Sequence, residues 1–159
     1  DVIARHCDFW FVNYTADYRK YEDNFAMIRR DVAALAERAQ KFGRKLGFGM
    51  SAHVICADTM EAAQARADEL ETYGQRDRIS STAARGLGAS LVGTADIVAE
   101  RMRRYEEIGV ELFLLNFHPM LPGLETFVSA VMPLLPPIGA APRLQSLSDN
   151  RGDAAACKR

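Results

Sequence analysis

A single histidine within an apolar run is the residue of this chain that is best suited to chemistry. His53 lies in the segment 47–58, which reads GFGMSAHVICAD and is otherwise small or apolar up to its final Asp58. An imidazole titrates near neutral pH, so it can accept or donate a proton in a reaction. We therefore take His53 as a candidate catalytic residue, against the alternative of a hydrogen-bonded histidine of the core.

The residues around His53 predict a strand that leads into a helix. Glycines at the start and the β-branched Val54 and Ile55 in the centre favour a buried strand. The sequence at 58–61, Asp-Thr-Met-Glu, has the spacing of a capping box, which predicts a helix over 60–73. Residues 74–90 are polar, small and glycine-containing, and a loop of this length is usually functional or mobile.

Further strands and helices alternate along the chain. The aromatic run 9–12 predicts a buried strand, and the run 110–117 is so continuously apolar that we expect both of its faces to be covered. Spacings of three and four between apolar residues predict helices over 17–42, 94–108 and 122–134. Three clear strands alternating with helices predict a parallel α/β architecture.

Length and composition limit the classes of protein to which the chain can belong. Its 159 residues, 48% of them hydrophobic, are enough for one domain with a core. A net charge of −1 lacks the basic excess of nucleic-acid-binding proteins, so we expect no nucleic-acid partner. No apolar run approaches the roughly 20 residues of a membrane span, so we expect no membrane partner and a cytoplasmic protein.

The three cysteines and the last residues suggest no further site. Cys7, Cys56 and Cys157 are odd in number and far apart, which favours reduced thiols over disulfides and predicts no metal site. Residues 136–159 are rich in turn-forming residues and lack periodicity, so we expect a disordered tail after a folded portion over 1–135.

Several phrases of the sequence, taken in order, resemble a known family. They are Gly-Arg-Lys at 43–45, His-Val-Ile at 53–55, Asp-Thr-Met-Glu-Ala at 58–62, Leu-Val-Gly-Thr at 91–94, and the run 109–117. Their order and spacing resemble the carboxy-terminal part of the bacterial luciferase-like, flavin-dependent monooxygenases, in particular the alkanesulfonate and dimethyl-sulfone monooxygenase branch.

The resemblance implies a fold and an association state. It implies a (β/α)8 TIM barrel, which takes about 250 residues, so this chain would supply the last three β/α units. We expect the chain alone to be incomplete, to bind flavin weakly and to be inactive or nearly so. In such barrels the carboxyl ends of the strands build the active site. An open sheet of three strands would leave an apolar edge and an unfilled barrel interior, so we expect the chain to associate, as a homo-oligomer in the simplest case.

The resemblance also implies a reaction. Members of the family use reduced flavin mononucleotide (FMNH2) and O2 to insert one oxygen atom into a small organic substrate, an organosulfur compound in the branch named above. A flavin reductase supplies the reduced flavin. Two alternatives remain open: a non-catalytic, truncated barrel remnant that acts by oligomerisation or partner binding, and a deazaflavin-dependent oxidoreductase of the same superfamily.

The resemblance assigns roles to individual residues. It implies that His53 is catalytic, that the cofactor is contacted by Asn13, Ser51, Gly86 and Gly88, and that the substrate is contacted by Arg85 and His118. Ser51 stands where the sulfonate branch has an arginine, and the loss of a guanidinium argues against a sulfonate substrate. The alternative for Arg85 is a solvated loop, and for Asn13 and His118 a hydrogen bond to a neighbouring loop.

Overall fold

The computed structural model describes residues 1–14, 17–76 and 86–136. Arg85 lies outside the described residues, as do most of the loop predicted at 74–90 and, except for Pro136, the tail predicted at 136–159. Among the helices that the structure describes, none combines the length and the apolar character that crossing a membrane requires.

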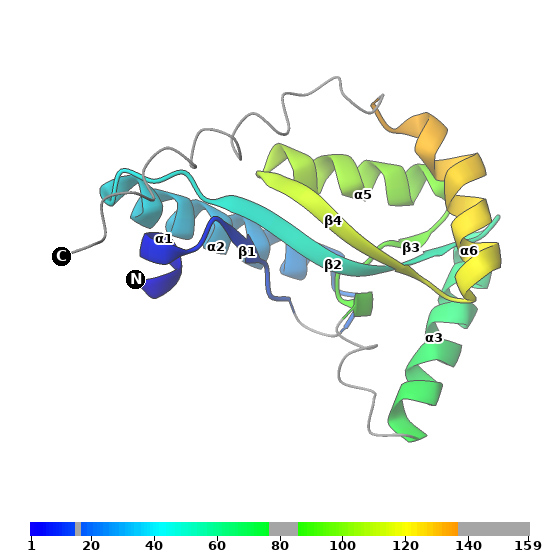
Figure 1. Ribbon diagram of the computed structural model, residues 1–159. Coiled ribbons are helices and arrows are strands. Elements are labelled where there is room, and N and C mark those ends of the chain that lie inside the picture. Colours follow the sequence, from blue (N-terminus) through cyan, green and yellow to red (C-terminus); the bar gives the residue numbers. More distant parts are fainter. Residues whose placement is uncertain (15–16, 77–85, 137–159) are drawn as a thin grey trace.

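Strands and helices alternate as the sequence predicts (Figure 1). The chain runs through α1 (Val2–His6), β1 (Phe9–Phe11), α2 (Tyr21–Lys41), β2 (Gly47–Cys56), α3 (Met60–Arg76), β3 (Val92–Gly93), α5 (Ala95–Glu107), β4 (Val110–Phe117) and α6 (Met120–Thr126). One turn of π-helix (Phe127–Val131) and one of 3-10 helix (Met132–Leu134) follow α6. All strand pairs are parallel, which confirms the α/β class.

The central strand of the sheet is β2. It pairs with β1 from Gly47 to Gly49 and with β4 from Phe48 to Val54. The N–H group of Gly47 donates to the carbonyl of Asp8, which precedes β1, and that of Ile55 donates to the carbonyl of Leu91, which precedes β3, over 2.9 Å each. Since alternate residues of a strand direct their N–H groups to the same edge, β1 and β3 share one edge of β2 and β4 occupies the other.

The sequence patterns did not predict β3. Its two residues pair with Ile55 and Cys56, but a strand this short shows no alternation that a pattern could reveal. Gly93 has a φ of +152°, and a Cβ placed there would lie 3.0 Å from the Ile97 side chain and 3.1 Å from that of Met60. Glycine therefore lets the starts of α3 and α5 approach this strand closely.

Two helices begin at other residues than predicted. The side chain and carbonyl of Asp17 accept hydrogen bonds from the backbone N–H groups of Arg19 (3.0 Å) and Lys20 (3.3 Å), forming a turn that delays α2 until Tyr21. The last helix begins at Met120 rather than at Pro122. Proline fits there because the first turn of a helix needs no N–H donor.

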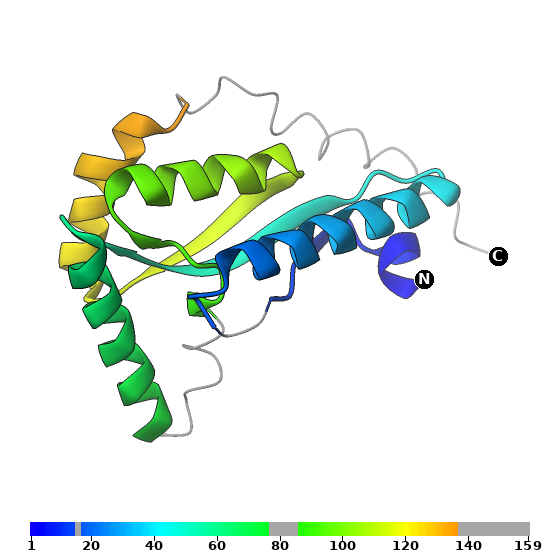
Figure 2. The same ribbon diagram turned by 180° about the vertical axis from the view of Figure 1, so that it is seen from behind.

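One face of the sheet is covered by α2 and α5, which lie in front of the strands in Figure 2. We call it the helix-covered face. It consists of the buried side chains of Phe48, Met50, Ala52 and Val54 on β2, packed in one core cluster with Ile28, Val32, Val98, Met102 and Tyr105 of the two helices.

The other face of the sheet is open. By alternation and register, this open face consists of Phe9, Phe11, Gly47, Gly49, Ser51, His53, Leu112, Leu114 and Asn116. Phe11, Leu112 and Leu114 are 42%, 44% and 57% exposed. The predictions that β1 is buried and that both faces of β4 are covered are therefore wrong, because a continuous apolar run does not reveal which face has a packing partner.

Candidate active site on the open face

His53 lies on the open face toward the carboxyl end of β2. It pairs with Asn116 of β4, and Ser51 pairs with Leu114, so these four side chains project from the same face of two neighbouring parallel strands. His53 and Ser51 are half-buried, whereas Asn116 and Leu114 are exposed. The carboxyl ends of parallel strands are where α/β proteins place their active sites.

A glycine is packed directly against the imidazole of His53. A Cβ added to Gly86 would overlap Cδ2 of His53 and would lie 3.1 Å from its Nε2. Any other residue at this position would have to move the histidine or its own backbone. The family resemblance implies that Gly86 contacts the cofactor, and in the structure the nearest side chain to Gly86 is the candidate catalytic residue itself.

The surroundings of His53 favour its neutral form. Burial lowers the pKa of His53 below its ordinary value of 6.5, and the nearby charge of His118 lowers it further. Its Nδ1 atom is buried and has no hydrogen-bond partner within the described residues. At neutral pH the ring is therefore uncharged, with one nitrogen able to accept a proton.

His118 is the second imidazole of the site. It follows β4 directly and lies two residues beyond Asn116, half-buried. Asn116 pairs with His53, so His118 follows β4 on the side of the sheet edge where His53 lies, and its charge contributes to the lowered pKa of His53. Since the two rings come from neighbouring strands, their closeness follows from the pairing of β2 with β4.

The other predicted site residues lie at different depths. Asn13 is exposed, two residues beyond the Phe11 that pairs with Gly49, so it follows the strand end next to Ser51. Gly88 is buried, and its carbonyl accepts hydrogen bonds from the Asn24 amide (3.0 Å) and the Ser90 hydroxyl (3.3 Å). Their cofactor contacts stay predictions.

Asn116 and Asn24 were not among the site residues predicted from the sequence. Asn116 is the only amide within the apolar run of β4, and parallel register with His53 would have placed it on the same face. Asn24 lies in the amphipathic pattern of α2, and the carbonyl of Gly88 that it contacts is 64 residues away in sequence. No sequence pattern of the helix could reveal that contact.

Metal ligands and thiols are the other groups by which a site of this kind could act. Within residues 1–14, 17–76 and 86–136, no three His, Cys, Asp or Glu side chains are grouped so that they could hold a metal ion. Cys56 ends β2, and burial raises the pKa of its thiol, so it stays protonated at neutral pH.

The chain is similar to known proteins over most of its length. The family model described as luciferase-like monooxygenase matches residues 1–112. Sulfoquinovose monooxygenase from Novosphingobium aromaticivorans is 27% identical, in a match that covers 73% of this chain and 42% of that protein.

Solved structures show the same fold. The crystal structure of DmoA from Hyphomicrobium sulfonivorans matches with a TM-score of 0.53 and 21% identity, over 82% of this chain and 37% of DmoA. EDTA monooxygenase (EmoA) from Chelativorans sp. BNC1 matches with a TM-score of 0.57 and 19% identity, over 91% of this chain and 44% of EmoA. The chain thus spans less than half the length of these relatives.

These findings confirm the resemblance drawn from the sequence. The neighbours are TIM barrels, and this chain corresponds to only a part of each. The chain belongs to the luciferase-like monooxygenase family, and its parallel α/β fold is a portion of that family's barrel.

Proposed function

We propose that the open face forms part of the active site of a reduced-flavin-dependent monooxygenase, which inserts one oxygen atom from O2 into a small organic substrate. The observation that carries this proposal is His53, a half-buried neutral imidazole near the carboxyl ends of paired parallel strands, with an unpartnered Nδ1 among the described residues. A buried nitrogen without a partner costs about 1–3 kcal/mol, and a bound ligand can satisfy it.

The open face has the chemistry that a flavin ring requires. A flavin ring is flat and largely apolar, with hydrogen-bonding groups along one edge. Leu114 offers exposed apolar surface beside Ser51, and the next pair along the strands, His53 with Asn116, offers polar groups. Ser51, His53 and Asn116 would hold the polar edge, and the bound cofactor would supply the reaction with O2 that side chains cannot perform.

The chain's own residues would handle protons and exclude water. At neutral pH the uncharged His53 would accept a proton from a substrate bound on the open face. Burial, and to a smaller extent the neighbouring His118, lower the pKa of His53 and so favour this uncharged form. Gly86 covers the Cδ2 edge of the ring and so restricts both its rotation and its contact with solvent. General acid or base catalysis of this kind contributes about 10²–10⁴-fold to a rate.

The substrate is inferred only as a class. The names of two relatives specify sulfoquinovose and EDTA, so the family accepts different organic molecules. Ser51 supplies a hydroxyl and no positive charge on the open face. We therefore propose a small organosulfur compound that needs no guanidinium at this position, such as a sulfide or sulfone.

The test is incorporation of ¹⁸O from ¹⁸O2. The complete polypeptide to which this chain belongs is incubated with FMN, a flavin reductase, NADH and separate candidate substrates (dimethyl sulfide, dimethyl sulfone, methanesulfonate and sulfoquinovose), and products are analysed by mass spectrometry. One labelled oxygen atom per product molecule, lost when the reductase is omitted, supports the proposal. Turnover with a reduced deazaflavin, or no label in any product from a folded protein, would instead favour the alternatives.

A further inference from the structure

We infer that Asn24 is a positioning residue for His53, acting through the segment Gly86–Val92, which we call the strap. Its expected effect on turnover rests on the proposed function. Its expected effect on His53 itself does not, because that effect can be measured without any substrate.

Asn24 joins two loops at the site. It lies in the first turn of α2, is 1% exposed, and its side-chain amide donates to the carbonyls of Asp17 (3.2 Å) and Gly88 (3.0 Å). Asp17 belongs to the loop after β1, and Gly88 belongs to the strap before β3. Removing the amide would leave two carbonyls without this donor, at about 1–3 kcal/mol for each one that stays buried.

The strap is held by polar side chains at successive carbonyls. Besides Asn24 at Gly88, the hydroxyl of Tyr105 donates to the carbonyl of Ala89 (3.0 Å), and the guanidinium of Arg101 donates to those of Ser90 and Val92 (3.1 Å for Val92). Asn24 and Ser90 are the two buried polar residues of the described part of the chain. The backbone of Ser90 has a φ of +58°, which is uncommon for residues other than glycine. A fixed set of donors therefore determines the path of the strap.

The start of the strap lies against His53. Gly86 is two residues before Gly88, so a shift of the Gly88 carbonyl is transmitted to the contact between Gly86 and the imidazole within about 7 Å of chain. Residues 86–91 are all buried, which leaves little room for the strap to move without Gly86 moving as well. Asn24 thus acts on His53 through Gly86 rather than by direct contact.

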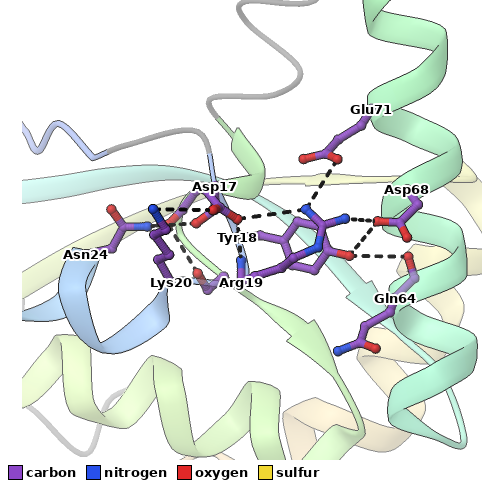
Figure 3. A network of polar contacts seen from close by, with 10 residues as sticks. Asp17, Tyr18, Arg19, Lys20, Asn24, Gln64, Asp68 and Glu71 are labelled. Carbon is purple, nitrogen blue, oxygen red and sulfur yellow. Dashed lines mark hydrogen bonds and ion pairs between the residues drawn. The ribbon is translucent and has the colours of Figure 1, made fainter.

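The loop that contains Asp17 is also held in place, by polar contacts with α3 (Figure 3). Tyr18 donates to the carboxylate of Asp68 on α3 over 2.7 Å, and Arg19 forms ion pairs with Asp68 and with Glu71 (3.5 Å). The amide of Asn24 consequently lies between a loop bound to α3 and a strap bound to α5. This is the arrangement expected of a residue that sets the position of both.

The experiment follows His53 by NMR titration in the whole protein. Around this ring the structure places Gly86 of the strap, His118 after β4 and, on the same face, Ser51 and Asn116. In Asn24→Ala, water reaches the imidazole as the strap loosens, so the pKa of His53 rises toward 6.5. Tyr105→Phe, which removes one hydroxyl, shifts it in the same direction by less.

The matched control is Ile28→Ala. Ile28 is fully buried one turn further along α2 and has no polar group, so its loss destabilises the core without removing a hydrogen bond to the strap. We expect the wild-type pKa of His53 in this variant. An unchanged pKa in Asn24→Ala, or the same shift in both variants, would overturn the inference.

Two further readouts complete the test. If Asn24→Ala fails to fold, Tyr105→Phe provides the test. Faster hydrogen exchange of the Ser90 amide together with a raised pKa of His53 would support the inference. The absence of both changes would refute it. In the oxygenation assay Asn24→Ala should lower kcat about tenfold or more with a smaller change in KM. A shifted pKa in a protein that oxygenates nothing would contradict the proposed function and leave the role of Asn24 intact.

Discussion

The two faces of the sheet are made by alternate residues of the same strands, yet they differ in burial and in the kinds of side chain that they present. On β2 the helix-covered face presents Phe48, Met50 and Val54, none more than 4% exposed. The open face presents Gly47, Gly49, Ser51 and His53 from the same ten residues. One face stabilises the fold, and the other combines polar groups with exposed apolar surface, as ligand sites do.

The glycines of β2 show how the open face is built. A Cβ at Gly47 would lie 2.7 Å from the ring of Phe9, and one at Gly49 would lie 3.1 Å from the ring of Phe11. The aromatic rings of β1 therefore lie across the backbone of β2, where the two glycines leave room for them. Further along the strand the rings end, and Ser51 and His53 project from the same face.

The largest effect is expected when the unfolding free energies of two substitutions are compared, one on each face of the sheet. Met50→Ala creates a cavity at a fully buried position of the helix-covered face and should cost about 2–5 kcal/mol of unfolding free energy. Leu114→Ala removes a side chain that is 57% exposed on the open face and should cost less than about 1 kcal/mol. Urea denaturation of the two variants measures the contrast, and equal losses would show that the open face is packed in solution.

A smaller effect is expected from adding a methyl group beside His53. Gly86→Ala forces the new Cβ onto the imidazole of His53 and should cost about 1–3 kcal/mol, with altered NMR signals of that ring. Gly49→Ala is the control, because the ring of Phe11 that it meets is 42% exposed and can move aside. Unaltered His53 signals in Gly86→Ala would mean that the contact is absent.

The smallest effect is the pH dependence of stability that His53 introduces. Its pKa is lowered on folding, so between 6.5 and the lowered value the unfolded chain binds more protons than the folded one. The contribution of His53 is therefore present in full above pH 6.5 and is lost as the pH falls through the lowered pKa. Thermal unfolding between pH 5 and 8 should show a shallower pH dependence in His53→Gln, and an unchanged one in Ser51→Ala.

The sequence patterns predicted what local periodicity can encode. The predicted strand at 110–117 coincides with β4, and that at 47–58 contains β2, because β-branched and apolar runs between turn residues are local signals. The pattern at 110–117 wrongly predicted two covered faces, since Leu112 and Leu114 are as apolar as their buried neighbours and only tertiary packing distinguishes them. An uncovered face was implied by the resemblance to an incomplete barrel and not by any pattern. The role of Asn24 depends on partners in two separate loops, which no pattern along one helix contains.

We propose that the open face performs its chemistry through His53. The most direct measurement is the steady-state rate of substrate oxygenation by His53→Ala with reduced flavin, beside His6→Ala, which removes an exposed imidazole of α1 instead. We expect a kcat about 10²–10⁴-fold lower in His53→Ala and a wild-type rate in His6→Ala. Wild-type turnover in a folded His53→Ala protein would contradict it.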